Sequence, residues 1–213
     1  MLRTLLLSAT FALTVCPTLV ADNWSHWRGP TGNSASTSGN PPTEWSDTKN
    51  VKWTVEVPGR SSGSPVVWED RVFIVSAVRT GEATGEASAE AARPPEQRNR
   101  FSRGRPSGPL PNLRFDVLCF NRADGNLLWQ KTATTATPHE ATHETNGFAS
   151  ASPCTDGKHV YAHFGSRGLY CYTMDGDLKW SRDDFGKMQT RSTFGEGSSP
   201  TISGPFIIVP WDH

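Results

Sequence analysis

One sequence pattern occurs twice in full and begins a third time, and this repetition constrains the fold more than any single residue. Each copy starts with a Ser-Pro pair, at Ser64, Ser152 and Ser199, followed by short runs rich in β-branched and aromatic residues. The first two copies end in a tryptophan four residues after the glycine of an Asp-Gly pair, at Trp129 and Trp180. A repeat of this kind predicts stacked copies of one structural unit.

The spacing of the copies predicts the size of that unit. The second and third Ser-Pro pairs lie 47 residues apart, and the two tryptophans lie 51 residues apart. Such a period, built from short strands, is typical of β-propeller blades. The Asp-Gly pairs at 124–125, 156–157 and 175–176 favour tight hairpins, because glycine tolerates a positive φ. We therefore expect an all-β fold, a β-propeller in the form of a partial ring of four-stranded antiparallel blades.

The chain resembles the pyrroloquinoline-quinone-like β-propeller repeat family over residues 45–213. That family includes quinoprotein alcohol dehydrogenases and a propeller subunit of the outer-membrane assembly machinery. Its docking motif runs Ala-x-Asp-x-x-Thr-Gly-x-x-x-Trp, and Gly125 and Trp129 match its last two fixed positions, whereas the Ala and Asp positions differ. The resemblance implies eight blades in the complete protein, with Trp53, Trp129 and Trp180 packed between neighbouring blades.

The N-terminus predicts the compartment. Residues 1–21 are typical of a secretory signal peptide, with Arg3 before an apolar run too short to span a membrane. We expect a secreted or periplasmic protein without a transmembrane segment, and Cys16 leaves lipid anchoring as an alternative. Residues 22–57 are expected to be an N-terminal arm that ends, over 45–57, in a strand that closes the ring. That strand is predicted from the alternation of Val51, Trp53, Val55 and Val57.

The repeat divides the rest of the chain into a blade over residues 58–131, a blade over 132–182 and a truncated blade over 183–213. An insertion over residues 79–113, rich in Ala, Glu, Gly, Arg and Pro, interrupts the first blade. This composition predicts a disordered loop, because it offers little apolar surface to bury; a basic tether for an anionic partner is the alternative. Because an incomplete ring exposes strand edges, we expect the N-terminal part of a longer protein.

Charge and cysteine content narrow the classes of function. The chain has 21 Lys and Arg and 21 Asp and Glu, and this formal net charge of zero does not indicate a nucleic-acid partner. The predicted mature chain keeps Cys119, Cys154 and Cys171. An odd count argues against a disulfide framework, so we expect small buried hydrophobic residues. A Cys154–Cys171 bridge within one blade is the alternative.

The segment His139-Glu140-Ala141-Thr142-His143 matches the H-E-x-x-H pattern of zinc proteases. The pattern brings two histidines to one face only when it lies on a helix. Asn146-Gly147 would end such a helix within about two turns, and no third ligand is identifiable in the sequence. We therefore expect no metal site here.

The residues just before each Ser-Pro pair form the candidate binding site. In a propeller the innermost strand of each blade begins at this point, so equivalent positions converge on one mouth of the central channel. Four polar residues occupy these positions: Arg60, His143, Asn146 and Glu196. The alternative is that the Ser and Gly residues around them only permit tight packing near the axis.

These features predict a non-catalytic propeller that binds or scaffolds a protein or carbohydrate at the channel mouth or the blade edges, with no cofactor. The alternative, implied by the resemblance, is a pyrroloquinoline-quinone- and calcium-dependent alcohol or sugar dehydrogenase. Calcium takes six to eight oxygen ligands, and Glu144, Asn146 and Glu196 are the inward set that this sequence offers. A sensor domain of a larger surface protein is a third hypothesis.

Overall fold

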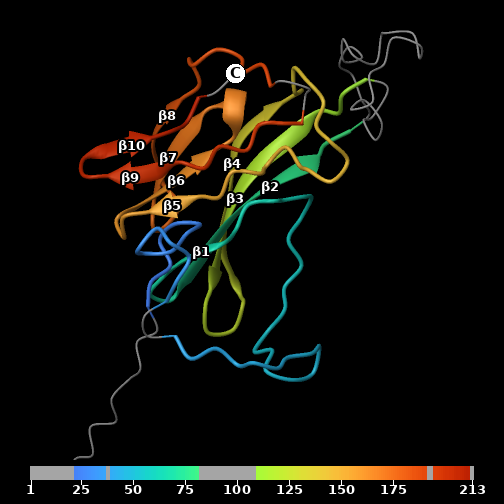
Figure 1. The fold of residues 1–213 in the computed structure, drawn as a ribbon. Helices are drawn as coiled ribbons and strands as arrows, with labels where there is room; N and C mark the ends of the chain where they lie inside the picture. The colour runs from blue at the N-terminus through green and yellow to red at the C-terminus, as the bar shows by residue number, and fades with distance from the viewer. Residues whose placement is uncertain (1–21, 37–38, 82–108, 191–193, 212–213) are drawn as a thin grey trace, which may run out of the picture.

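The computed structural model describes residues 22–36, 39–81, 109–190 and 194–211. These residues form two four-stranded antiparallel sheets and a two-stranded hairpin (Figure 1). The prediction of an all-β fold built from four-stranded antiparallel sheets is therefore confirmed. The predicted signal peptide and residues 82–108 of the predicted insertion lie outside the described residues. Within the described ranges, no helix is long and apolar enough to cross a membrane.

The first sheet is a meander of β1 (Val66–Trp68), β2 (Arg71–Arg79), β3 (Leu113–Asn121) and β4 (Leu127–Ala136). β2 and β3 pair along their whole length, from Arg71 opposite Asn121 to Arg79 opposite Leu113. Just beyond, the Thr80 amide donates to the Asn112 carbonyl at 3.1 Å. The predicted insertion thus connects two paired strands. The boundary predicted after residue 131 falls inside β4, which ends at Ala136.

The second sheet repeats this order with β5 (Cys154–Thr155), β6 (His159–His163), β7 (Leu169–Thr173) and β8 (Leu178–Arg182). A 3-10 turn, Gly165–Arg167, joins β6 to β7. The hairpin that follows consists of β9 (Thr201–Ser203) and β10 (Phe206–Ile208). The order in both four-stranded sheets is that of the chain, so each strand pairs with its sequence neighbour.

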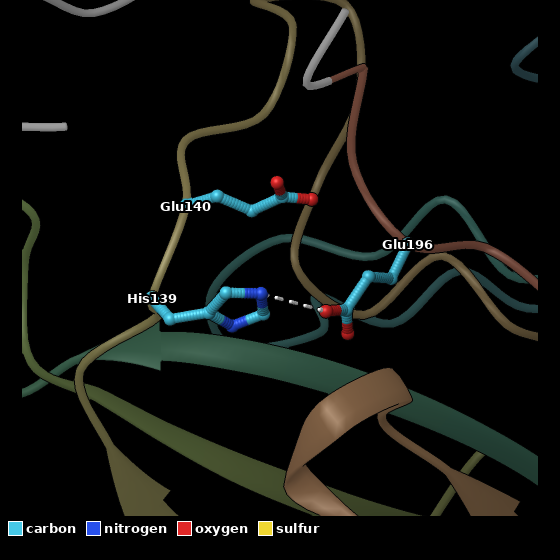
Figure 2. A group of neighbouring side chains, drawn as sticks. All are labelled: His139, Glu140 and Glu196. Carbon is cyan, nitrogen blue, oxygen red and sulfur yellow. Dashed lines mark ion pairs between the residues drawn. The ribbon is translucent and has the colours of Figure 1, made fainter. Parts of the chain in front are cut away.

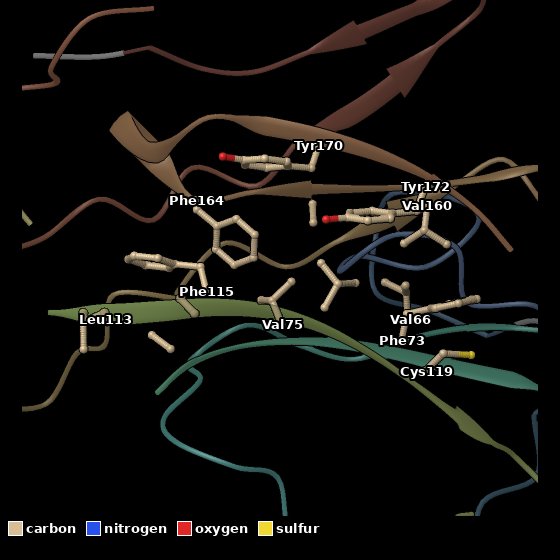
Figure 3. Packing of buried hydrophobic residues seen from close by; sticks show 14 residues of the cluster. Val66, Phe73, Val75, Leu113, Phe115, Cys119, Val160, Phe164, Tyr170 and Tyr172 are labelled. Atoms are coloured by element: carbon tan, nitrogen blue, oxygen red, sulfur yellow. The ribbon is translucent and has the colours of Figure 1, made fainter. Parts of the chain in front are cut away.

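The hydrophobic core lies between the two sheets (Figure 3). Alternate residues of β3 face it, and Phe115 packs against Phe164, which directly follows β6, with ring centroids 5.3 Å apart. A second cluster on the other face of the second sheet packs Tyr161 and Leu169 against Ile202 and Ile207 of the hairpin. The described residues therefore form three stacked layers: first sheet, second sheet and hairpin.

The N-terminal arm crosses all three layers. Trp24 exchanges two backbone hydrogen bonds of 2.8 Å with Val67 of β1, and the Ser25 carbonyl accepts one from the Thr155 amide of β5. His26 Nε2 lies 2.9 Å from the hydroxyl of Thr201 in β9. The arm thereby covers the edge of β1, which would otherwise present unpaired backbone groups.

The predicted strand over residues 45–57 is wrong as far as the described residues are concerned. In this range the only pairing joins Ser46 to Lys49, and residues 51–57 are not assigned to a strand. Val51 and Val55 are 45% and 37% exposed. Alternation of apolar residues defines a face, but a strand also needs a neighbour for its backbone groups, and the described residues provide none here.

The three cysteines of the described chain are free and buried. Cys154 and Cys171 both lie opposite Tyr161, on strands that flank β6. Since neighbouring strands lie about 4.8 Å apart, their Cα atoms are roughly 10 Å apart, beyond the ~7 Å limit for a disulfide. The Cys154–Cys171 alternative is therefore wrong, because one strand separates the two residues.

Candidate functional site

A pocket of about 470 Å³ opens where β2 ends and β3 begins. Three of the four predicted site residues line it, namely Arg60, His143 and Asn146. The segment that links the two sheets forms one wall, and residues of the first sheet form the other. Its lining residues also include Arg79, Glu144, Phe148, Leu113 and Pro111.

The loop that carries His143 and Asn146 is held by the backbone of Phe194. The Phe194 carbonyl accepts hydrogen bonds from the Thr142 hydroxyl at 3.0 Å and from Asn146 Nδ2 at 2.9 Å. Asn146 Oδ1 in turn accepts from the Gly147 amide at 2.8 Å and the Ser150 hydroxyl at 2.5 Å. The amide group of Asn146 is thus engaged on both sides, and its role is to fix this wall of the pocket.

His143 is also positioned by its neighbours. Its Nδ1 lies 2.8 Å from the Thr145 hydroxyl, and its ring packs against Phe194 with centroids 5.6 Å apart. The ring is therefore presented to the pocket in one orientation. The segment that carries His139 and His143 is not helical, so the H-E-x-x-H pattern does not place the two histidines on one helix face.

Two arginines give the pocket its positive charge. The Arg60 guanidinium donates through Nη2 to the Glu144 carbonyl oxygen at 2.7 Å, and the Arg60 backbone is fixed by two hydrogen bonds of 3.0 Å to Ala77. Arg79 ends β2 and is exposed. Within the described part of the chain, neither arginine forms an ion pair with a carboxylate. Arg79 was missed by the sequence analysis because it was assigned to the insertion.

Glu196, the fourth predicted residue, lies in a separate buried cluster (Figure 2). Its carboxylate accepts hydrogen bonds from the Ser166 amide and the Ser166 hydroxyl, both at 2.6 Å. Arg167 Nη1 lies 3.7 Å away, and both side chains are about nine-tenths buried. Glu196 therefore holds the 3-10 turn of the second sheet and does not line the pocket that contains Arg60, His143 and Asn146.

His139 and Glu140 complete this cluster from the linking segment. His139 Nδ1 lies 3.1 Å from Arg167 Nη1, and its Nε2 lies 2.6 Å from the Met188 carbonyl. Because the guanidinium only donates and the carbonyl only accepts, the imidazole is neutral with its proton on Nε2. Glu140 accepts from the Thr190 hydroxyl at 2.6 Å. The cluster therefore joins the linking segment, the 3-10 turn and the segment before the hairpin.

The donor atoms of His139, Glu140 and Glu196 lie within 4.8 Å of one another, a spacing that could hold a metal ion. Both imidazole nitrogens are already hydrogen-bonded, however, and the Arg167 cation lies beside the same carboxylates. Burial lowers the pKa of Arg167, and the charges of Glu196 and Glu140 oppose that shift. These groups fit an internal ion-pair network, and they do not fit a cation site.

Two of the three tryptophans predicted to pack between blades make the same contact. Trp129 Nε1 donates to the Met174 carbonyl at 2.9 Å, and the ring covers Gly176 at φ +87°. Trp53 Nε1 likewise donates to the Arg122 carbonyl at 2.9 Å, and its ring covers Gly125 at φ +78°. A Cβ on either glycine would lie within 3 Å of the indole. Trp180 is 41% exposed and packs against Tyr161 of its own sheet.

Residues 113–209 match the family model described as outer membrane protein assembly factor BamB, a PQQ-like repeat model. This match supports the assignment of these residues to a PQQ-like repeat family. The matched range begins with β3 and runs just past β10. A search of curated proteins finds no significant match.

The PQQ-like repeats are also joined by a serine ladder that the sequence analysis missed. The Ser64 amide donates to the Ser152 hydroxyl at 2.8 Å, and the Ser152 amide donates to the Ser199 hydroxyl at 2.9 Å. The serine of each Ser-Pro pair thus accepts from the same position in the preceding copy. The repetition of the Ser-Pro pair is the sequence signal for this ladder.

The three residues named as the inward set for calcium do not converge on one point. Glu144 and Asn146 line the pocket where β2 ends, whereas Glu196 is bound to Ser166 in the buried cluster. The amide oxygen of Asn146 is already occupied by Gly147 and Ser150. A calcium site needs several free oxygen ligands at one point, so these three residues do not fit one.

Proposed function

We propose that the chain is part of a secreted or periplasmic β-propeller that binds or scaffolds a partner and does not catalyse a reaction. The two meander sheets, taken as blades, and the PQQ-like repeat family support the propeller. The family model concerns an outer membrane assembly factor, which supports an extracytoplasmic location together with the signal-like residues 1–21. The segments 22–57, 58–131, 132–182 and 183–213 are proposed as the arm, two blades and a further partial blade.

The pattern of tryptophan contacts supports a ring. Trp129 of the first sheet docks on the last turn of the second, and Trp53 docks on the last turn of the first. Trp53 therefore occupies the place that a preceding blade would fill in a ring. Trp180 stands at the equivalent position of the second sheet and is the group that would dock on the next blade. The resemblance extends this arrangement to eight blades.

The observation that carries a binding role is the pocket lined by Arg60, His143 and Asn146, which we place at the mouth of the propeller channel and call the channel-mouth pocket. Its volume falls within the usual range of about 300–1,000 Å³ for small-ligand sites. The walls are fixed by hydrogen bonds that use Thr142 and Asn146, so the pocket is preformed. The exposed arginines and Glu144 are polar groups that a ligand could engage, whereas the carboxylates of the buried cluster already have partners.

The binding role can be tested by hydrogen–deuterium exchange on the full chain with panels of peptides and oligosaccharides. We expect a ligand that slows exchange at residues 59–60 and 142–148, which line the pocket. A ligand that protects only other surfaces would contradict the site. In parallel, the chain is mixed with pyrroloquinoline quinone and calcium and assayed for dye reduction with alcohols and sugars; turnover would contradict the non-catalytic role.

A further inference from the structure

We propose that the channel-mouth pocket binds an acidic sugar residue, a hydroxylated ring that carries one carboxylate or phosphate group. This inference rests on the proposed binding function and specifies its ligand. It is argued from the charges that line the pocket, from its apolar surface and from the pairing of the strands beside it.

The arginines are the groups that would receive the anion. Arg60 and Arg79 both line the pocket, and among the described residues neither has a carboxylate partner. A guanidinium presents parallel N–H donors that match a carboxylate or a phosphate. Arg60 is steadied by its bond to the Glu144 carbonyl, which uses Nη2 and leaves other donors of the fork available.

The other lining groups suit a sugar ring. The Glu144 carboxylate lines the same pocket and makes no hydrogen bond or ion pair to another described residue, so it can accept hydrogen bonds from hydroxyl groups. Phe148, Leu113 and Pro111 supply an apolar surface for the ring itself. A carboxylate beside two arginines also repels a ligand with several adjacent acidic groups, which favours one anionic group among hydroxyls.

The strands beside the pocket argue against an extended peptide. Peptides often bind by adding a strand to a free sheet edge. Here β2 pairs with β3 along its whole length, and Ala77 of β2 is also bridged to Arg60 on its other side. Within the described ranges, the pocket therefore offers no free strand edge at Ala77, and a ligand must be recognised through side chains.

The test measures binding to the full chain by NMR titration with three matched probes: the methyl glycosides of galacturonic acid and galactose, and a galactose phosphate. We expect at least one acidic probe to bind about 10-fold or more tightly than the neutral one, and to lose affinity as salt is raised. Arg60→Gln and Arg79→Gln should each weaken that binding about 10-fold. Arg182→Gln is the matched control, because Arg182 is exposed and pairs with Asp184 outside the pocket.

The outcomes separate this inference from the proposed function. Tighter binding of the galacturonide or of the phosphate, each with arginine dependence, supports the inference and tells the two anions apart. Equal binding of the neutral glycoside, or no binding of either acidic probe, overturns it. An acidic peptide that binds with the same arginine dependence and better than any sugar also overturns it, yet leaves the pocket as a binding site. The proposed binding role fails if the exchange experiment finds no ligand at the pocket, and the proposed non-catalytic role fails if the dye-reduction assay shows turnover.

Discussion

Replacing Trp129 by alanine should destabilise the protein more than any other tryptophan substitution at the repeated position. The side chain is half-buried between the sheets, with ring centroids 5.9 Å from Phe73 and 6.2 Å from Tyr172. If the substitution removes about 100–150 Å² of buried apolar surface, the loss is about 2.5–3.8 kcal/mol at ~25 cal/mol per Å². The indole hydrogen bond to Met174 adds about 1 kcal/mol.

The measurement is the free energy of unfolding in urea, followed by circular dichroism. Trp129→Phe keeps most of the packing and should lose about 1–2 kcal/mol. Trp180→Ala is the matched control, and because that side chain is 41% exposed we expect a loss of only about 1 kcal/mol. If Trp129→Ala and Trp180→Ala cost the same, the contact with Gly176 is not what joins the sheets.

A double-mutant cycle isolates the contact itself. Gly176→Ala would place a Cβ 2.8 Å from Trp129 Cδ2 at a φ of +87°. The backbone strain costs about 1–2 kcal/mol, and the clash adds to it. In the Trp129→Ala background the clash with the indole is gone, while the backbone strain and the close approach to Lys131 Cε remain, so the two substitutions should be non-additive by about 1 kcal/mol. Strict additivity would refute the docking argument.

Four further predictions follow from the structure. Ser152→Ala should lower the free energy of unfolding by about 1–2 kcal/mol, because it removes the acceptor of the Ser64 amide. Ser64→Ala is the control: its hydroxyl is exposed, so the free energy of unfolding should change by no more than about 0.5 kcal/mol. Glu196→Gln should cost about 1–3 kcal/mol in the same assay, since it removes the buried charge opposite Arg167; no loss would contradict the network. Burial lowers the pKa of His163 below its ordinary value of 6.5. The free energy of unfolding should therefore be highest above pH 6.5 and should fall as the pH is lowered from 6.5 to the pKa of the folded state. His163→Asn should reduce this dependence on pH. Burial raises the pKa of the Cys119 and Cys154 thiols to about 12 and that of Cys171 to about 11, so Ellman's reagent should leave all three unmodified in the folded protein at neutral pH and react with them in urea.

The sheets were predictable because their signals are local. A hairpin turn is encoded by an Asp-Gly pair, and Gly157 and Gly176 do adopt positive φ, at +83° and +87°. The strand faces follow from alternation, as in β3, where alternate residues enter the core. Residues 51–57 carry the same alternation and form no strand in the described chain. The alternation in residues 51–57 specifies which side chains would share one face of a strand. It does not specify which other strand their backbone would pair with.

The candidate site was predictable in part, for a related reason. Arg60, His143 and Asn146 meet at one pocket because they precede the first strands of adjacent sheets, β1 and β5. Glu196 holds an equivalent place in the sequence, yet it turns to the amide of Ser166 at the start of a 3-10 turn. That turn depends on Gly165, at φ +58°, where a Cβ would collide with the Glu196 carboxylate. A contact between two loops of this kind has no periodic signal.

The scaffold and the site draw on different parts of the sequence. Two features that recur join sheet to sheet. The serine of a Ser-Pro pair contacts the serine of the neighbouring copy, and the closing Trp129 contacts the last turn of the second sheet. The features that do not recur, above all the long segment from Pro138 to Ala151, line the pocket and the buried cluster. A residue that recurs in every copy makes the same structural contact each time, so it has little freedom to vary for the recognition of a ligand. Function in this chain is therefore expected at positions where one copy differs from the next. Arg60, Arg79 and the segment that links the two sheets are such positions.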